Sequence, residues 1–504
     1  MTQDFFQSVC ETARRAAVYH SIADTLEWDE RTQMPRAAGE FRATQVAELR
    51  SAAHRLRTST EYGDQLAELD SNDNQSERHS DHSAIVRCLH RDWQRDCKLP
   101  TEFVAELSVA TSRGQQLWEQ AREEDSFAVF RDALDTVIQL KREAGARMSE
   151  GTDRTNYEAL LDEYEPDASI ADLNPVFSDL KSRLTELIKR IGDAPRRPNV
   201  DLLRREFPVD DQRAFSEFAA EAVGFDFQRG RLDETVHPFC TTLGPNDCRI
   251  LTRYDAHWFP TSFYGTLHEA GHGLYEQGLR SDQFGLPSGS YTSLGIHESQ
   301  SRLWENQVGR SRAFWTWLYP EAVRRVPSLF DGVSIDELYF AINNIEPSLI
   351  RVEADEATYN LHILIRFELE QALIDGALTV DDLPQAWDDE YERCLGIRAS
   401  SPKQGVLQDV HWSCGLIGYF PTYTLGNLAA AQLFAAAEQQ LGDLATSFEK
   451  GEFSGLLEWL RDNVHRHGRN YSGAELVQNA TGASLSADSL MQYLEAKLAP
   501  LYGI

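Results

Sequence analysis

Apolar residues recur every three or four positions along most of the chain, and this spacing predicts a mostly helical protein. In the first half it predicts amphipathic helices over about 4–58, 84–122, 126–150, 170–192 and 212–224. In the second half it predicts helices near 262–278, 296–318, 335–375, 381–395, 425–449 and 452–465. Polar clusters interrupt the pattern at Ser71–Ser76, Asp193–Pro198 and Ser400–Gly405, where we expect loops.

The best strand pattern lies between about 228 and 254. Residues Cys248–Tyr254 alternate in part between apolar and polar side chains, as a half-buried strand does. An edge strand that pairs with the backbone of a bound peptide would fit this segment. A small structural hairpin fits it equally well, and both interpretations stay open.

The expected helix near 262–278 carries His268, Glu269 and His272 in an H-E-x-x-H motif. Positions four apart share one helix face, so both imidazoles can aim at one zinc ion while Glu269 activates a water molecule. Glu298 can complete a ligand set that leaves the fourth position open, as catalytic zinc sites require. The alternative is a surface helix that carries two solvated histidines.

The residues around this motif favour the metal site. Apolar residues flank it on both sides, which predicts a helix buried on most of its faces, with Thr261 or Ser262 as N-cap after Pro260. Burying two histidines and a glutamate without partners is costly, and a metal ion removes that cost. The sequence therefore indicates a zinc hydrolase of peptide bonds, although the same ligands also accept Co²⁺ or Mn²⁺.

The charge balance is strongly acidic. The chain of 504 residues has 80 Asp and Glu against 49 Lys and Arg, for a net charge of -31, and only 7 of the basic residues are lysines. Such a surface is unsuited to nucleic acid or anionic membranes. Concentrated salt would screen its self-repulsion, so we expect a protein of a salty cytoplasm. The alternative is a merely acidic protein with arginine-rich codon usage.

Other features of the sequence indicate the cellular compartment and the domain organisation. The 7 cysteines are scattered without a C-x-x-C pair, which is typical of reduced thiols in the cytosol. We find neither a signal-peptide pattern at Met1–Phe5 nor a run of roughly 18 apolar residues, so we expect no membrane attachment. We expect one catalytic unit over 1–504, with a helical lobe at about 1–225 and a zinc-site lobe at about 226–504.

Four segments share the order and spacing of the motifs of one peptidase family. They are His268–His272, His297–Gln300, Ile350–Asp355 (I-R-x-x-A-D) and Gly405–Trp412 (G-x-x-Q-D-x-H-W). From about residue 8 to its end the chain therefore resembles the carboxypeptidase Taq family of thermostable metallocarboxypeptidases. Leu26–Asp29, Met34–Pro35 and Tyr157–Asp162 look like further segments of that family. One departure is Leu251, which stands where the family's D-x-R-x-T motif has Thr, while Arg249 is retained.

The resemblance implies a mostly helical, zincin-like (gluzincin) fold with a deep central groove and a small β-sheet beside the zinc helix. It also implies a homodimer that releases single residues from peptides with a free C-terminus. Glu269 would act as general base. His411 would stabilise the oxyanion together with Tyr423, for which Tyr419 is the rival. A core aromatic role is the alternative for either tyrosine.

An exopeptidase of this kind must also recognise a terminal carboxylate, which a forked guanidinium suits. Arg351 and Arg249 are the candidates, and a structural ion pair with Glu353 or Asp355 is the alternative for Arg351. Weaker candidates for the walls of the substrate site are His237, Asp355, Gln408 and Asp409. His297 could orient substrate or simply support its loop.

Two rival functions stay open. A zinc oligopeptidase or endopeptidase would carry the same ligands, and only its products would differ. A peptide-binding protein without activity would be expected to have lost a ligand or the base, yet His268, Glu269, His272 and Glu298 are all present.

Overall fold

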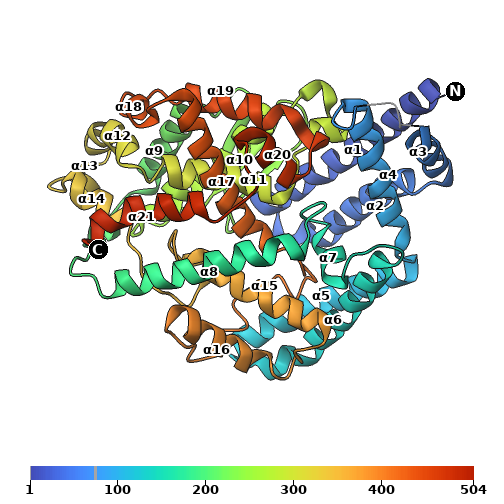
Figure 1. Ribbon diagram of the computed structural model, residues 1–504, viewed down its shortest axis with the longest axis horizontal. Coiled ribbons are helices and arrows are strands. Elements are labelled where there is room, and N and C mark those ends of the chain that lie inside the picture. The colour runs from blue at the N-terminus through green and yellow to red at the C-terminus, as the bar shows by residue number, and fades with distance from the viewer. Residues whose placement is uncertain (1, 73–76) are drawn as a thin grey trace. The chain divides into compact units, whose positions relative to one another are not determined.

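The computed structural model describes residues 2–72 and 77–504, so part of the expected loop at Ser71–Ser76 lies outside the described residues. Helices dominate it, as the sequence predicts (Figure 1). The contacts divide the chain into two units, and each is assembled from three segments. The first unit contains Met1–Asp96, Pro198–Ile342 and Ala430–Ser484, and the second Cys97–Arg197, Asn343–Ala429 and Leu485–Ile504. These bounds differ from the two consecutive lobes expected from the sequence, because segments distant along the chain pack together.

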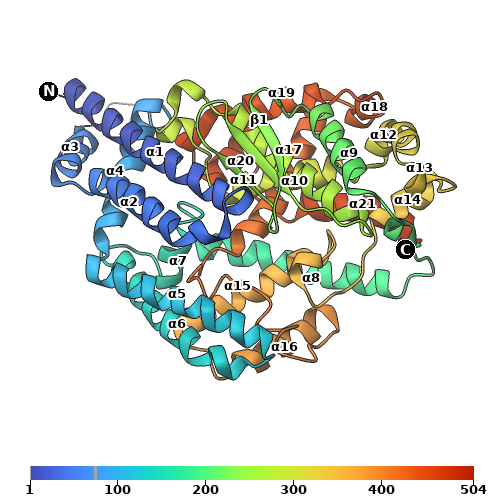
Figure 2. The same ribbon diagram turned by 180° about the vertical axis from the view of Figure 1, so that it is seen from behind.

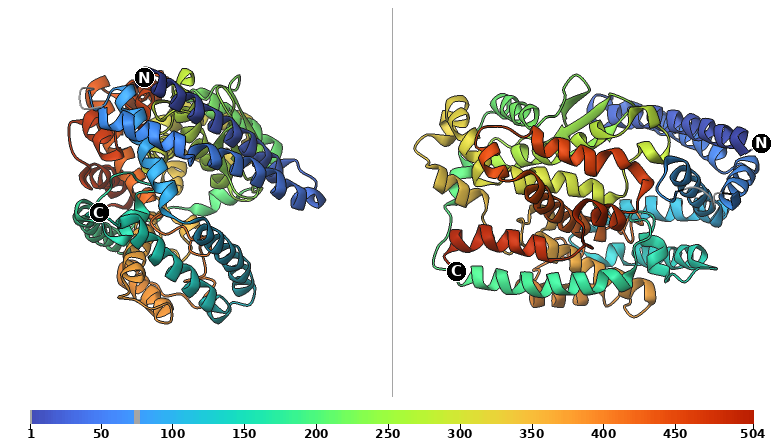
Figure 3. Two further views of the ribbon diagram at one scale, coloured as in Figure 1. Left: turned by 90° about the vertical axis from the view of Figure 1, so that its right-hand side faces the viewer. Right: turned by 45° about the horizontal axis from the view of Figure 1, so that its top comes forward.

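In the first unit α1 (Thr2–Thr32) lies beside α2 (Gly39–Arg57) (Figure 3). The single helical stretch expected over 4–58 is therefore two helices. Pro35 separates them, because proline lacks an N–H and disfavours a helical residue before it. The next helices are α3 (Thr60–Asn72) and α4 (Asp81–Lys98).

A small sheet of three strands follows, within the segment where the sequence predicts strands. Its order is β1 (Gly230–Glu234), β3 (Cys248–Thr252), β2 (Phe239–Thr242). β1 runs parallel to β3, whereas β2 is antiparallel to it and pairs Thr242 with Cys248. The hairpin interpretation fits β2 and β3, and pairing of an edge strand with a peptide stays a prediction.

The sheet has two differently packed faces. Cys248 faces the metal-motif helix α10 (Phe259–Gly278), where its Sγ lies 4.0 Å from the carbonyl oxygen of Gly273. Successive side chains of a strand point to opposite faces. Arg249 accordingly points the other way, and its guanidinium carbon lies 4.1 Å from the ring centre of Trp28 on α1. Figure 2 shows the strands with α1 beside them.

The remaining helices of the first unit surround α10 with an aromatic core. The ring of Phe263 stacks between those of Phe215 and Phe259, with ring centres 5.2 Å from Phe215 and 5.0 Å from Phe259. These elements are α9 (Val209–Ala222), α11 (Leu294–Arg302), η5 (Leu303–Val308), α12 (Arg312–Arg325), α13 (Pro327–Phe330), α14 (Ile335–Ile342), α18 (Leu444–Phe448), α19 (Ser454–Asn463) and α20 (Gly473–Thr481).

Three expectations about these helices are wrong. The single helix expected over 425–449 is two helices, α17 (Pro421–Leu441) and α18, separated at Gly442. α10 begins at Phe259 after Trp258, so neither Thr261 nor Ser262 is its N-cap, and Pro260 occupies the first turn where its missing N–H does no harm. The helix expected over 296–318 is interrupted by the π-helical segment η5.

The second unit contains α5 (Thr101–Glu123), α6 (Phe127–Ser149), α7 (Asn156–Leu161), α8 (Ile170–Gly192), α15 (Tyr359–Asp375), α16 (Leu383–Leu395), the first half of α17 (Pro421–Leu441), and α21 (Asp488–Tyr502). α5 and α6 pack against each other, as do α8 and α15 (Figure 1). The prediction of a single helix over 335–375 is wrong, since α14 ends at Ile342 and α15 begins only at Tyr359. Asp355 stabilises the break by accepting hydrogen bonds from the backbone N–H groups of Glu346 and Thr358.

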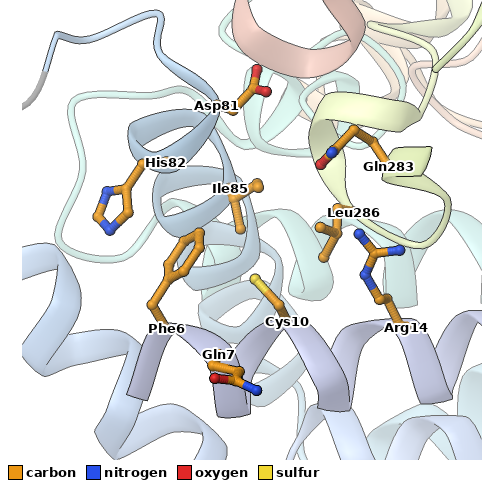
Figure 4. Close-up of a pocket in the computed structure, with 9 residues that line it drawn as sticks. All are labelled: Phe6, Gln7, Cys10, Arg14, Asp81, His82, Ile85, Gln283 and Leu286. Carbon is orange, nitrogen blue, oxygen red and sulfur yellow. The ribbon is translucent and has the colours of Figure 1, made fainter. Parts of the chain in front are cut away.

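One cavity of about 490 Å³ opens between α1, α4 and the segment around Gln283 and Leu286 (Figure 4). Asp81 at its wall is paired with Arg280 at 2.8 Å, and Arg14 donates to backbone carbonyls. No residue of the H-E-x-x-H motif lines the cavity. Among the described residues, no helix has the length and apolar character needed to span a bilayer.

Candidate metal centre

The first unit brings together the three residues predicted as metal ligands. His268 and His272 lie on α10, and Glu298 lies on α11. The Nε2 atoms of the two histidines are 3.6 Å and 3.5 Å from Glu298 Oε2. Over the described ranges 2–72 and 77–504, this is the one group of three or more His, Cys, Asp or Glu residues that could hold a metal ion.

Hydrogen bonds fix the tautomers of both histidines. His272 Nδ1 lies 3.0 Å from the carbonyl oxygen of His297, which can only accept a proton. His268 Nδ1 lies 2.9 Å from the carboxylate of Glu305. With Nδ1–H donating in each ring, both Nε2 lone pairs are directed toward Glu298. Two imidazole nitrogens and a carboxylate oxygen therefore converge, which is a donor set that fits a divalent cation.

The close packing of α10 against α11 brings these three donor atoms together. A Cβ atom on Gly271, between the two histidines, would lie 2.6 Å from both the carbonyl oxygen of Gln300 and Cα of Ser301 on α11. Only glycine permits such an approach of the two backbones. His465 holds α11 from another side, through a 3.0 Å hydrogen bond between its Nε2 and Gln300 Oε1.

Glu305 is a residue of the site that sequence reasoning missed. It lies on η5 with Arg302 and Arg310 at 3.2 Å and 3.3 Å, and these charges outweigh its burial and lower its pKa to about 2. Arg302 also binds Glu298 Oε1 at 2.7 Å, which leaves Oε2 toward the histidines. An acidic residue seven positions after Glu298 was the available signal, because such spacing returns to about the same helix face.

Glu269 is buried beside the two histidines, with 6% of its surface exposed. Within the described part of the chain, its Oε2 has no hydrogen-bond partner. Burial, aided by the charges of Glu298 and Glu305, raises the pKa of Glu269 to about 7. A buried carboxyl of this pKa is suited to accept and release a proton near neutral pH.

His297 supports the ligand His272 rather than standing free. The two rings stack with centres 4.3 Å apart, and His297 Nε2 lies 3.0 Å from Glu276 Oε1. Glu276 in turn accepts a 2.9 Å hydrogen bond from Thr242 of β2. The edge strand β2 is thus connected, through Glu276 and His297, to the candidate ligand His272. His237, by contrast, lies exposed in the loop between β1 and β2.

In the second unit, the I-R-x-x-A-D and G-x-x-Q-D-x-H-W segments bind each other. Asp409 lies between Arg351 at 2.8 Å and Arg366 at 2.6 Å, and both arginines are buried. Gln408 Oε1 accepts a 2.8 Å hydrogen bond from the backbone N–H of Arg351. The alternative of a structural ion pair between Arg351 and Glu353 or Asp355 is not what the structure shows, since the acidic partner of Arg351 is Asp409 of the later motif.

The same unit pairs His411 with Tyr423, whose hydroxyl lies 3.3 Å from His411 Nε2. Tyr419 instead packs its ring 5.5 Å from His411 and 5.2 Å from Tyr164. Burial lowers the pKa of His411 to about 4, so its imidazole is neutral near pH 7. The hydroxyl of Tyr423 thus lies within hydrogen-bonding distance of the histidine, and the ring of Tyr419 packs near it.

Arg249 belongs to the first unit, and its guanidinium has a partner both at its N–H edge and over its plane. Its Nε and one terminal nitrogen bind Asp247 at 2.9 Å and 3.0 Å, while Trp28 covers its guanidinium plane. The D-x-R part of the altered motif therefore forms an ion pair on the face of the sheet that turns away from α10. Leu251, where the family has Thr, is fully buried.

Comparisons with known proteins agree with this site. Residues 8–498 match the carboxypeptidase Taq (M32) metallopeptidase family. The chain is 43% identical to thermostable carboxypeptidase 1 of Thermus thermophilus, over 99% of each chain, and 36% identical to carboxypeptidase 1 of Bacillus subtilis, over 97% of each. A solved M32 carboxypeptidase from Deinococcus radiodurans superimposes with a TM-score of 0.95 at 39% identity, covering 99% of this chain and 100% of that one. The chain therefore belongs to the carboxypeptidase Taq (M32) family of metallopeptidases, and it is a peptide-bond hydrolase of the carboxypeptidase type.

Proposed function

We propose that this protein is a zinc carboxypeptidase that releases single amino acids from the C-terminus of peptides, with Glu269 as general base. The observation that carries the proposal is the convergence of His268 Nε2 and His272 Nε2 on Glu298 beside the unpartnered oxygen of Glu269. Co²⁺ or Mn²⁺ would suit the same ligands.

The chemistry divides between the ion and the chain. A bound divalent cation supplies Lewis acidity and makes a water molecule easier to deprotonate. Glu269 takes the proton of the attacking water and passes it to the nitrogen of the departing residue. Its burial beside the two histidines, with an oxygen that accepts no hydrogen bond from the described residues, supports this role.

His411 and Tyr423 are proposed as the donors that stabilise the oxyanion formed during attack. Family resemblance and their mutual hydrogen bond support this role. Replacing Tyr423 with Phe should lower kcat more than replacing Tyr419 with Phe. The opposite order would assign the role to Tyr419.

Recognition of the terminal carboxylate is proposed for Arg351 or Arg249. Each guanidinium already binds an aspartate, and each retains N–H groups that those aspartates do not use. Lysine variants of both should be compared on one peptide with a free C-terminus and on its amidated form. The arginine that binds the carboxylate is the one whose replacement removes the preference for the free form.

Assembly and environment are also proposals. Family resemblance supports a homodimer, which light scattering during size-exclusion chromatography would test. The net charge of -31 supports work in a salty cytoplasm.

The decisive experiment is mass spectrometry of the products from a short unblocked peptide in molar salt. Wild type with zinc should give a ladder that loses one C-terminal residue at a time. Chelator and Glu269→Gln should each abolish the ladder. Internal cuts, or cleavage of a peptide with a blocked C-terminus, would instead indicate an endopeptidase or oligopeptidase. Lack of cleavage by the folded, metal-loaded protein would favour a peptide-binding role.

A further inference from the structure

Glu370 is a buried carboxylate of the second unit that the proposed chemistry does not use. It lies on α15 and has no exposed surface. Its Oε1 accepts a 2.9 Å hydrogen bond from the indole N–H of Trp412. Its Oε2 accepts bonds from the hydroxyl of Tyr157 at 2.8 Å and from the backbone N–H of Gly418 at 3.0 Å. A single side chain therefore satisfies three buried donors.

Two of those donors belong to the segment that carries the His411 and Tyr423 pair. Trp412 directly follows His411, and Gly418 lies between that histidine and Tyr423. Gly418 has a φ of +86°, and a Cβ atom there would lie 2.8 Å from the backbone nitrogen of Leu161 on α7. Glu370 thus binds the segment at two points, and at Gly418 the path of the backbone is tightly constrained.

A stripe of α5 contacts the chain around the same segment. Gly114, Trp118 and Arg122 are spaced four apart and share one helix face. Trp118 donates to the carbonyl of Leu407 at 3.0 Å, and Arg122 to that of Gln408 at 3.1 Å. The residues that α5 binds, Leu407 and Gln408, precede His411 in the chain, whereas the two that Glu370 binds in this segment follow it.

We propose that Glu370 is a positioning residue that fixes the orientation of the His411–Tyr423 pair through Trp412 and Gly418. The proposal rests on the proposed function in one respect, namely that this pair assists peptide cleavage. A glutamine at this position has only one oxygen, so it cannot accept from both Trp412 and the Tyr157–Gly418 side. The segment should then lose one of its two attachments while the volume of the core stays the same.

Protonation of Glu370 would have a related effect. Burial raises the pKa of Glu370 to about 7, even though its three hydrogen bonds oppose the shift. The titratable groups that face it are Tyr157 of α7 and Lys141 of α6, and the charge of Lys141 also lowers the pKa. The carboxylate form, which accepts from all three donors, predominates only above neutral pH.

The kinetic test compares Glu370→Gln with wild type, using Asp375→Asn as the matched control at an exposed position of the same helix. We expect kcat to fall by about 10- to 100-fold with little change in KM, as misplacement of a catalytic group causes. Tyr157→Phe, which keeps the carboxylate, should cause a smaller fall. Melting curves identify a variant that has failed to fold, and Tyr157→Phe then carries the test.

Double variants separate positioning from a general structural role. If Glu370 acts through His411, Glu370→Gln should cause little further loss in a His411→Ala background, because residues that act as a unit are not additive. Full additivity of the two losses would overturn the proposal, as would unchanged kcat in Glu370→Gln.

A spectroscopic measurement keeps this result distinct from the fate of the proposed function. The ring signals of ¹³C-labelled His411, assigned by their loss in His411→Ala, should shift in Glu370→Gln and stay unchanged in Asp375→Asn. If wild type cleaves no peptide, the proposed function fails, and the His411 signals alone then test whether Glu370 positions this histidine. Unshifted His411 signals in Glu370→Gln would overturn its positioning role.

Discussion

Glu305 and the candidate metal ligand His268 form a 2.9 Å hydrogen bond on the side of the ring away from Glu298. A carboxylate at that position fixes the tautomer of the imidazole and makes it a stronger ligand. Arg302 binds both Glu298 and Glu305, so the ligand and its support share one positive partner. Metal affinity should therefore depend on a residue that does not contact the ion.

Glu305→Gln should weaken zinc binding by about 10- to 100-fold, the usual effect of removing such a carboxylate. Competition with a chromophoric chelator measures the change. Glu353→Gln, an exposed carboxylate swap, provides the control and should bind zinc as wild type does. Equal affinities of Glu305→Gln and wild type would contradict this role.

Gly271→Ala should destabilise the protein, because its methyl group would overlap α11 at 2.6 Å. We expect a loss of about 1–3 kcal/mol in the free energy of unfolding, as overpacking typically costs. Gly265→Ala on the same helix is the control, since its Cβ would meet only Thr252 Oγ1, at 3.4 Å. Denaturant unfolding of both variants tests the comparison, and equal stabilities would show that α11 adjusts freely.

Asp409→Asn should destabilise the second unit strongly, because it leaves two buried arginines without their common carboxylate. Removal of one partner from a buried ion pair costs about 3–5 kcal/mol. The two arginines hold the pKa of Asp409 well below its usual range, despite its burial. The stabilisation is therefore full above the unfolded pKa, about 4, and is lost as pH falls below it. Unfolding measured at pH 7 and pH 3 should show a smaller difference between variant and wild type at the lower pH.

Metal removal should lower thermal stability, because an ion that binds only the folded state stabilises it by mass action. At a free zinc concentration 100 times Kd, the gain is about 2.7 kcal/mol. Calorimetry with chelator and after zinc is restored measures the effect. His268→Ala should melt at the same temperature under both conditions, and a persisting shift would place the stabilising ion elsewhere.

Stability should rise with salt up to molar concentrations, because counterions screen a net charge of -31. Melting temperatures in potassium chloride and in an isotonic uncharged osmolyte separate screening from exclusion effects. Equal stability in low and high salt would leave an acidic protein with arginine-rich codon usage as the better explanation.

The sequence predicted the helical architecture and the grouping of His268, His272 and Glu298, because both depend largely on spacing along the chain. His268 and His272 share a helix face by their four-residue separation alone. The support of His268 by Glu305 involves a π-helical segment, and the pairing of Arg351 with Asp409 joins motifs far apart in sequence. The Arg351–Asp409 contact follows from tertiary packing, which residue spacing does not encode, and the seven-residue separation of Glu298 and Glu305 was only a weak signal for the other contact. Helix ends were missed for a similar reason, since Asp355 ends a helical pattern by bonds to backbone groups on both sides of it.

The three-segment composition of each unit has a consequence for biosynthesis. A ribosome that has translated through Glu305 has supplied every ligand and its support, yet the first unit still lacks Ala430–Ser484. That late segment contains His465, which holds Gln300 beside the ligand Glu298. The contact that holds α11 beside the candidate ligands therefore forms only after residue 465 has been translated. A truncated chain that stops before residue 430 would carry the complete motif without the contacts that hold it in place.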